Sequence, residues 1–282
     1  MIKDVTEEIA QDTAEVTGLI QSGVDPHLFK PSRSDITKIL RADLVLYNGL
    51  LLEGKMTDAL TRANSAKRSV VAVAEKVDTE QLLDASVPGT YHDPHVWMSP
   101  SLWSNAAEQI RDALIASNPE QTLRYKKNTE AYLLKLKTLD SWAQSSLATI
   151  PKNARVLVTA HDAFNYFGKR YDLEVRGIQG ISTESEAGVK DIEEIVALLV
   201  ERKIPAVFIE STVSERNVAA LVEGANAKGH QVKIGGTLYS DAMGTAGTPE
   251  GTYIGMIQHN VRQVTKALGG TPLDYPSLTP DN

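Results

Sequence analysis

Residues 118–147 read NPEQTLRYKKNTEAYLLKLKTLDSWAQSSL, and this stretch decides how the chain is organised. It opens with a typical helix start: a capping Asn118, a first-turn Pro119 and an acidic Glu120. Apolar residues then recur every three or four positions and so share one helix face, namely Tyr132, Leu136, Leu139, Ala143 and Leu147. The pattern predicts one helix that ends before Pro151 and is about 45 Å long at 1.5 Å per residue.

A helix of this length is much longer than an ordinary crossover between two strands requires. The chain of 282 residues also exceeds the usual size of a domain with one core. We therefore predict a first lobe at residues 1–117, a linking helix at 118–150 and a second lobe at 151–282. The alternative is a long helix inside one larger domain.

The rest of the chain alternates between short apolar runs and helical patterns, which is typical of an α/β fold. The continuous β-branched runs indicate strands of mostly parallel sheets, at residues 44–47, 70–74, 156–159, 206–209 and 232–234. Between them, Ser32 with Asp35 three residues later predicts one helix start. Ser214 and Gly229 bracket another predicted helix. We expect two lobes, each a mostly parallel sheet flanked by helices and joined by the long helix.

Composition excludes several classes of protein. Basic residues number 29 and acidic residues 36, a formal charge of -7 with no long basic run, so we expect no nucleic-acid partner. The sequence contains no cysteine, which excludes disulfides, thiolate metal sites and a cysteine nucleophile. No run of about 18 apolar residues is present. A metal site in this chain would have to use histidine and carboxylate ligands.

Three of the six histidines follow an apolar run or a tight turn. Asp-Pro-His occurs twice, ending at His27 and His95, and His161 follows the strand predicted at residues 156–159. The proline restricts the backbone, and the aspartate before it can accept a hydrogen bond that fixes the ring or the loop. Asp241 follows the last predicted strand in a similar way. Ligands bind at such carboxyl ends of strands in open α/β sheets.

The four positions lie 66 to 80 residues apart, which suits a site between lobes and not a zinc finger. Spacing by itself is weak support, because a single histidine is more often a surface or core residue than a ligand. We expect that ordinary role for His92, His230 and His259. His92 lies three residues before His95 and is also a candidate auxiliary ligand.

Several motifs occur in the order found in one receptor family: residues 22–29 (SGVDPHLF), 42–50 (ADLVLYNGL), 93–97 (DPHVW), 158–164 (VTAHDAF), 207–211 (VFIES), 240–244 (SDAMG) and 251–253 (GTY). With these motifs the chain resembles the cluster A-I zinc and manganese receptors of ABC importers, especially those of the TroA type. The resemblance extends from Met1 to about Gly270.

The resemblance implies two α/β lobes joined by one long helix, with a metal ion bound by His27 and His95 from the first lobe and by His161 and Asp241 from the second. Manganese-selective relatives often have glutamate at the third position, where this chain has His161. Three imidazoles and one carboxylate suit zinc better, although manganese could be the physiological metal. The segment Ser86–Asp93 is short and carries only His92, unlike the long His-rich loop of dedicated zinc scavengers.

The resemblance also implies an extracytoplasmic location, either periplasmic or membrane-anchored, and a membrane permease of an ABC importer as partner. We expect a monomer. Relatives normally have a β-strand before a segment like Met1–Val5, so we expect one strand fewer in the first sheet. The opening residues do not have the basic and then apolar pattern of a secretion signal.

Four protein ligands would close the coordination shell, so we expect binding and delivery of the ion and no enzyme activity. We expect Glu210 to hydrogen-bond a ligand, with helix capping as the alternative, and Trp97 and Tyr239 to pack around the ligand loops. Metal release is expected from local movement of the Asp241 or His95 loop. The competing functions are a zinc hydrolase, for which no His-Glu-x-x-His motif is present, and an adhesin of the same fold.

Overall fold

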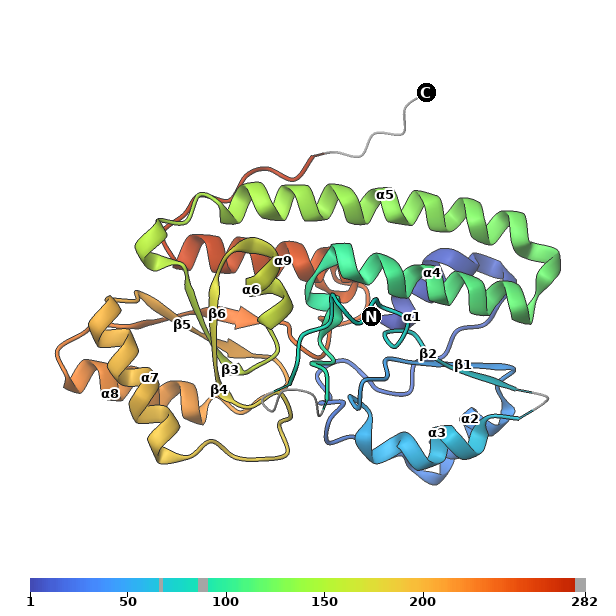
Figure 1. Ribbon diagram of the computed structural model, residues 1–282, viewed down its shortest axis with the longest axis horizontal. Helices are drawn as coiled ribbons and strands as arrows, with labels where there is room; N and C mark the ends of the chain where they lie inside the picture. The colour runs from blue at the N-terminus through green and yellow to red at the C-terminus, as the bar shows by residue number, and fades with distance from the viewer. Residues whose placement is uncertain (66–67, 86–90, 277–282) are drawn as a thin grey trace.

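The computed structural model describes residues 1–65, 68–85 and 91–276. Before the long helix come elements with these bounds: α1 Ile2–Ala10, η1 Gln11–Thr13, α2 Arg33–Arg41, β1 Leu44–Tyr47, η2 Gly54–Met56, α3 Thr57–Ala63, β2 Ser69–Ala72, η3 Val96–Met98 and α4 Pro100–Ser117. Strands β1 and β2 pair in parallel. Helix α3 contacts the sheet and α2, and α4 contacts both strands. This is the first lobe, drawn in blue to blue-green in Figure 1.

The predicted long helix is confirmed. After η4 at Pro119–Gln121, α5 runs from Thr122 to Leu147, 26 residues or about 39 Å. All five residues of its predicted apolar face are buried. The helix packs against α1 and α4 on one side of the molecule and against α6 and α9 on the other. It therefore spans both lobes along one edge, as Figure 1 shows.

The second lobe follows α5, with these bounds: η5 Lys152–Ala154, β3 Val156–His161, α6 Asn165–Tyr171, β4 Glu174–Gln179, α7 Val189–Arg202, β5 Ala206–Glu210, α8 Arg216–Ala227, β6 Lys233–Leu238, η6 Pro249–Gly251 and α9 Tyr253–Ala267. β3 pairs with β4 and β5 pairs with β6, both in parallel, and β3 lies next to β5. Helices α7 and α8 contact these strands, as do α6 and α9. The expected fold class, two α/β lobes with parallel strands joined by a long helix, is confirmed.

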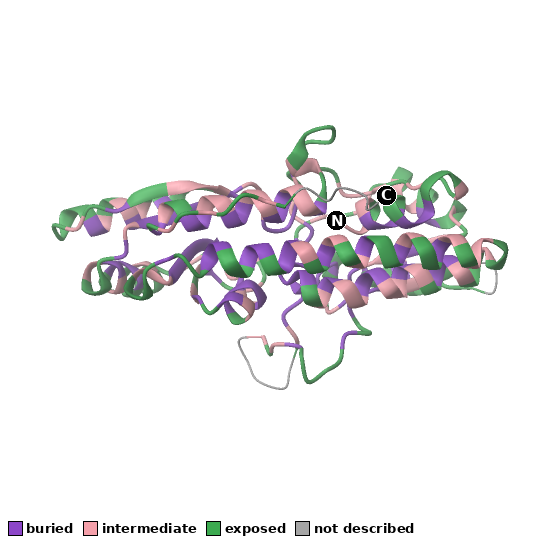
Figure 2. Cartoon of the chain, turned by 90° about the horizontal axis from the view of Figure 1, so that it is seen from above, coloured by how far each residue is buried: buried purple, intermediate pink, exposed green. Residues whose placement is uncertain are grey.

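The helices on either side of α5 pack around a shared hydrophobic core. One large cluster of buried apolar side chains includes residues of α1, α4, α5, α6 and α9, and so continues from one lobe to the other beneath α5. Figure 2 shows buried and exposed residues alternating along the helices, as expected for helices that cover a core with one face. Within the described residues, no helix is both long and apolar enough to cross a membrane.

Strand β4 was not predicted. Its sequence, EVRGIQ, contains Glu174 and Arg176, and only its last two residues are buried. The charged side chains form ion pairs at the surface, between Arg176 and Glu174 and between Arg202 and Glu174. A strand of this kind lacks the continuous apolar run that identified the others.

Candidate metal centre

The four predicted ligands come from four separate segments of the fold. His27 lies in a turn between α1 and α2, and His95 immediately precedes η3. His161 is the last residue of β3, and Asp241 follows the end of β6. Two ligands thus precede α5 in the sequence and two follow it. The structure brings all four together between the lobes.

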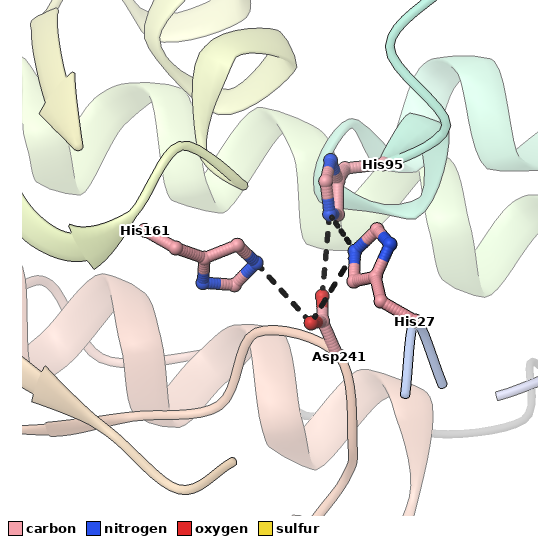
Figure 3. A group of neighbouring side chains, drawn as sticks. All are labelled: His27, His95, His161 and Asp241. Carbon is pink, nitrogen blue, oxygen red and sulfur yellow. Dashed lines mark hydrogen bonds and ion pairs between the residues drawn. The ribbon is translucent and has the colours of Figure 1, made fainter. Parts of the chain in front are cut away.

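The ligand atoms of the four residues face one another, as Figure 3 shows. Nε2 of His161 lies 3.2 Å from Oδ2 of Asp241, and Nε2 of His95 lies 3.4 Å from Oδ1. Nε2 of His27 is 3.8 Å from Oδ2 of Asp241 and 3.3 Å from Nε2 of His95. Zinc bonds of about 2.0–2.1 Å place the ligand atoms of a tetrahedral shell about 3.3–3.4 Å apart. The spacing suits one small cation.

The cluster is closed to solvent and its polar atoms are short of partners. His95 and His161 are fully buried, and His27 and Asp241 are 5% and 7% exposed. Within the described residues, Nε2 of His161 and both carboxylate oxygens of Asp241 are buried without a hydrogen bond. Leaving such groups unpaired costs free energy, and a cation among them would remove that cost. The donor set therefore fits a metal ion.

Both Asp-Pro-His motifs form the same local turn. The backbone N–H of His27 donates to Oδ1 of Asp25 at 2.8 Å, and that of His95 donates to Oδ1 of Asp93 at 2.9 Å. In the second motif, Nδ1 of the His95 ring also lies 2.7 Å from Oδ1 of Asp93. The second aspartate therefore orients the ring as well as the loop, and it directs Nε2 toward the cluster.

Glu210, the last residue of β5, holds His161 in a similar way. One carboxylate oxygen accepts the backbone N–H of His161 at 2.9 Å, and the other lies 2.5 Å from Nδ1 of the ring. Glu210 is almost fully buried, and β3 and β5 are neighbours in the lobe. Its carboxylate contacts the ligand at the end of β3 and does not cap a helix.

The charges around the cluster shift the histidine pKa values in opposite directions. Burial, together with the neighbouring imidazoles, lowers the pKa of His27 to about 4 despite the nearby Asp241. Burial also disfavours a charge on His95, but Asp93 and Asp241 outweigh it and raise the pKa to about 9. Glu210 and Asp241 likewise raise the pKa of His161. The pKa of Asp241 falls well below its usual range, because His161 and His95 outweigh its burial.

The segments that carry the ligands are also bonded to one another. Nε1 of Trp97 donates to the carbonyl of Ser240 at 2.8 Å, which joins the His95 and Asp241 loops. The Tyr253 hydroxyl at the start of α9 donates to the carbonyl of Trp97 at 2.7 Å. Trp97 thus packs in the ligand loops as expected, with its ring centroid 5.1 Å from that of His95. The Tyr239 ring packs instead against His259 in α9.

Sequence reasoning missed three residues that fix these loops. Asn260 in α9 accepts the backbone N–H of Tyr239 and donates to its carbonyl. Asn165 in α6 donates to Oδ2 of Asp93, and the Tyr166 hydroxyl donates to the carbonyl of Asp93. Only Asn260 gave a signal in the sequence, because it is a polar residue on the mostly apolar face of its helix.

The other histidines lie outside the cluster. The Nε2 atoms of His230 and His259 lie within hydrogen-bonding distance of the carbonyls of Ile204 and Thr237. His92 has its ring Nδ1 3.6 Å from Asp84. Residues 86–90 of the short segment before His95 lie outside the described residues.

Comparison with known proteins identifies the family. The model of the family described as "ZnuA: Zinc-uptake complex component A periplasmic" matches residues 1–267. The chain belongs to this family. Proteins of this family are receptors of metal uptake that work outside the cytoplasm with ABC importer permeases, so the chain is an extracytoplasmic receptor and not an enzyme.

Individual relatives are similar over nearly the whole chain. Manganese-binding lipoprotein MntA of Bacillus subtilis is 49% identical over 95% of this chain and 87% of its own length. Zinc-binding protein TroA of Treponema pallidum is 44% identical over 95% of this chain and 86% of its own length. The solved structure of that periplasmic zinc-binding protein has a TM-score of 0.92 and covers 95% of this chain and 96% of its own.

A more distant solved structure, that of Fe(III)-bound YtgA from Chlamydia trachomatis, is 28% identical with a TM-score of 0.87 and covers 97% of this chain and 96% of its own. The names of these relatives refer to manganese, zinc and iron(III). Membership of the family therefore shows a role in metal uptake, and it does not identify which metal this chain binds.

Proposed function

We propose that this chain captures one divalent transition-metal ion, zinc or manganese, through His27, His95, His161 and Asp241 and delivers it to the permease of an ABC importer. The proposal rests on one observation. Three imidazoles and one carboxylate from the two lobes form a buried cluster, and their ligand atoms are spaced as in the coordination shell of one metal ion. The relatives named for zinc and manganese support the same conclusion.

The donor set favours zinc when both metals are offered to the purified protein. Three neutral imidazoles prefer the later divalent metals, and affinity for nitrogen-rich sites rises from manganese toward zinc. Manganese remains the alternative cargo, since the relative that is 49% identical is named for manganese. The ion fills a closed shell and is cargo, held until the permease receives it.

Two carboxylates support the ligands in this proposal. Glu210 holds His161 and Asp93 holds His95, each through the ring nitrogen opposite the metal-binding one.

The units of the molecule are residues 1–117, the linking helix region 118–150 and residues 151–282. One chain supplies all four ligands, so we propose a monomer, and the charge of -7 supports the absence of a nucleic-acid partner.

The experiment is a competitive titration of metal-free protein with zinc and manganese in the presence of a chromogenic chelator. The unmodified chain is expected to bind one ion per molecule, zinc more tightly than manganese. His161→Ala is expected to weaken binding by at least about 100-fold. Removing a metal ligand lowers the affinity more than removing a residue that only supports a ligand, which costs about 10- to 100-fold. His92→Ala removes a histidine outside the cluster and should bind like the unmodified chain.

Circular dichroism of both variants separates loss of binding from loss of fold. The proposal fails if the unmodified chain binds neither metal at micromolar concentration, or if a folded His161→Ala variant binds as well as the unmodified chain.

A further inference from the structure

The segment that carries His27 is fastened to the opposite lobe by two side-chain hydrogen bonds. The hydroxyl of Ser22 donates to the carbonyl of Met243 at 2.8 Å, and the hydroxyl of Thr183 donates to Oδ2 of Asp25 at 2.5 Å. Ser22 and Asp25 belong to the first lobe, whereas Met243 and Thr183 belong to the second. The turn at residues 22–27 is therefore bonded across the boundary between the lobes at two positions, Ser22 and Asp25.

His27 depends on this fastening more than the other histidine ligands do. Rings of His95 and His161 are each oriented by a buried carboxylate at Nδ1. Among the described residues, no carboxylate pairs with Nδ1 of His27. Instead, the backbone N–H of His27 donates a hydrogen bond to Oδ1 of Asp25. Asp25 therefore restrains the backbone of the turn that carries His27.

Thr183 donates a hydrogen bond to the other carboxylate oxygen of Asp25. With one oxygen of Asp25 bonded to His27 and the other to Thr183, the aspartate links the ligand to the second lobe. Because Asp25 is only partly buried, without the hydroxyl its side chain could turn toward water and release the N–H of His27. A hydrogen bond to a charged acceptor is stronger than one between neutral groups.

The segment that carries Thr183 is itself anchored beside the metal centre. Gln179, which pairs with His161 across β3 and β4, donates from its side-chain amide to the carbonyl of Ser185 at 3.2 Å. The neighbouring Glu184 forms an ion pair of 3.0 Å with Lys55 of the first lobe, but this pair is exposed. Residues 179–185 thus bridge the strand end at His161 and the turn at His27.

We propose that Thr183 is a positioning residue that holds His27 in the metal centre from the opposite lobe through Asp25, and so lengthens the residence time of the bound ion. The inference rests on the proposed metal-binding function of the four-residue cluster. Thr183 touches no ligand atom. Its effect should fall on the dissociation of the ion, since the loosened turn lets His27 leave the shell more often, and not on the association rate.

The test measures metal dissociation by stopped flow, with zinc-loaded protein mixed with excess chelator. Thr183→Val keeps the side-chain shape and removes the hydroxyl, and dissociation is expected to become about 3- to 10-fold faster, as for the loss of one hydrogen bond. Thr183→Ser retains a hydroxyl and should restore the slow rate. Association rates should stay within twofold of the unmodified chain in all variants.

Two control variants are matched to the substitution. Thr138→Val makes the same chemical change on the exposed side of α5, where the hydroxyl donates to the carbonyl of Leu134 in its own helix. Glu184→Gln removes the exposed ion pair next to Thr183, and such pairs contribute little. Both variants should release zinc at the rate of the unmodified chain.

The route through Asp25 is tested by a double-mutant cycle. In an Asp25→Ala background, Thr183→Val should add no further acceleration, because the link to His27 is already gone. The proposal is overturned if folded Thr183→Val releases zinc at the unmodified rate, or if its effect is equally large without Asp25. Absence of zinc binding by the unmodified chain would instead overturn the proposed function.

Discussion

At the scale of single residues, the proposed metal centre places three carboxylates beside three imidazoles. Asp93, Glu210 and Asp241 stabilise protons on His95 and His161, whose pKa values are raised, whereas His27 is kept neutral by burial. A divalent cation brings two positive charges into the same space. Its binding therefore replaces the charge of the two protons that His95 and His161 must give up before their Nε2 atoms can act as ligands.

This charge balance predicts that metal affinity keeps rising above neutral pH. His95 is protonated in the metal-free protein below a pKa of about 9, so lowering the pH from 9 makes metal compete with a proton at this residue. Apparent affinity should fall about tenfold per pH unit for each proton displaced, beginning well above the ordinary histidine pKa of about 6.5. His27, with a pKa of about 4, should not contribute to this range.

Chelator competition between pH 6 and pH 9 measures the effect, and calorimetry in buffers of different ionisation enthalpy counts the protons released. We expect one to two protons at neutral pH. An affinity that is constant above pH 7, with no proton release, would contradict the assignment of the protons to His95 and His161.

At the scale of elements, the sequence was most informative where apolar residues are continuous or recur at helical spacing. The strands at residues 44–47 and 206–209, the capping box of Ser32 with Asp35 and the buried face of α5 all match prediction, because each has a local signature in apolar spacing or capping residues. β4 has charged residues at its exposed positions and no such signature. Contacts such as that between Tyr166 and Asp93 join residues 73 positions apart, and no local pattern indicates them.

The position of β4 against β3 depends on a residue without a side chain. A Cβ atom added to Gly177 would lie 2.5 Å from the backbone nitrogen of Asp162 and 2.7 Å from the carbonyl carbon of His161. These are backbone atoms and cannot rotate away. The absence of a side chain at this position lets the two strands approach at the point where His161 enters the metal centre.

Gly177→Ala is therefore expected to destabilise the metal-free protein by about 1–3 kcal/mol, the usual cost of overpacking, and to weaken metal binding by displacing His161. Urea denaturation and chelator competition measure the two effects. Gly180→Ala is the matched control, since a Cβ atom there meets no atom within 4 Å. Equal stability and affinity of the two variants would show that the close approach has no role.

At the scale of the whole molecule, the lobes are joined by more than the linking helix. Helix α5 packs against elements of both lobes, and the rings of Trp103 in α4 and Tyr253 in α9 stack with centroids 5.7 Å apart. The backbone N–H of Tyr253 also donates to Asp4 in α1 at 3.0 Å. The core continues across this boundary, so a wide rotation of one lobe against the other would expose buried apolar surface.

We therefore expect the metal-free and metal-bound proteins to differ by local loop movement and not by a wide hinge. Small-angle X-ray scattering of the zinc-loaded protein and of the chelator-treated protein should give radii of gyration that agree within experimental error. Crystal structures of both states would identify the loops that move. A rigid-body rotation of one lobe on removal of the metal would rule out this expectation.

The distribution of the ligands along the chain has a further consequence. In the proposed function, an ion bound at positions 27, 95, 161 and 241 would act as a cross-link that closes most of the chain into loops, much as a set of disulfides would in a chain that has no cysteine. Neither lobe can then unfold without giving up half of the ligands. The bound ion would thus add to the contacts that already join the lobes, and its delivery would leave a receptor that unfolds and is cleaved by proteases more easily.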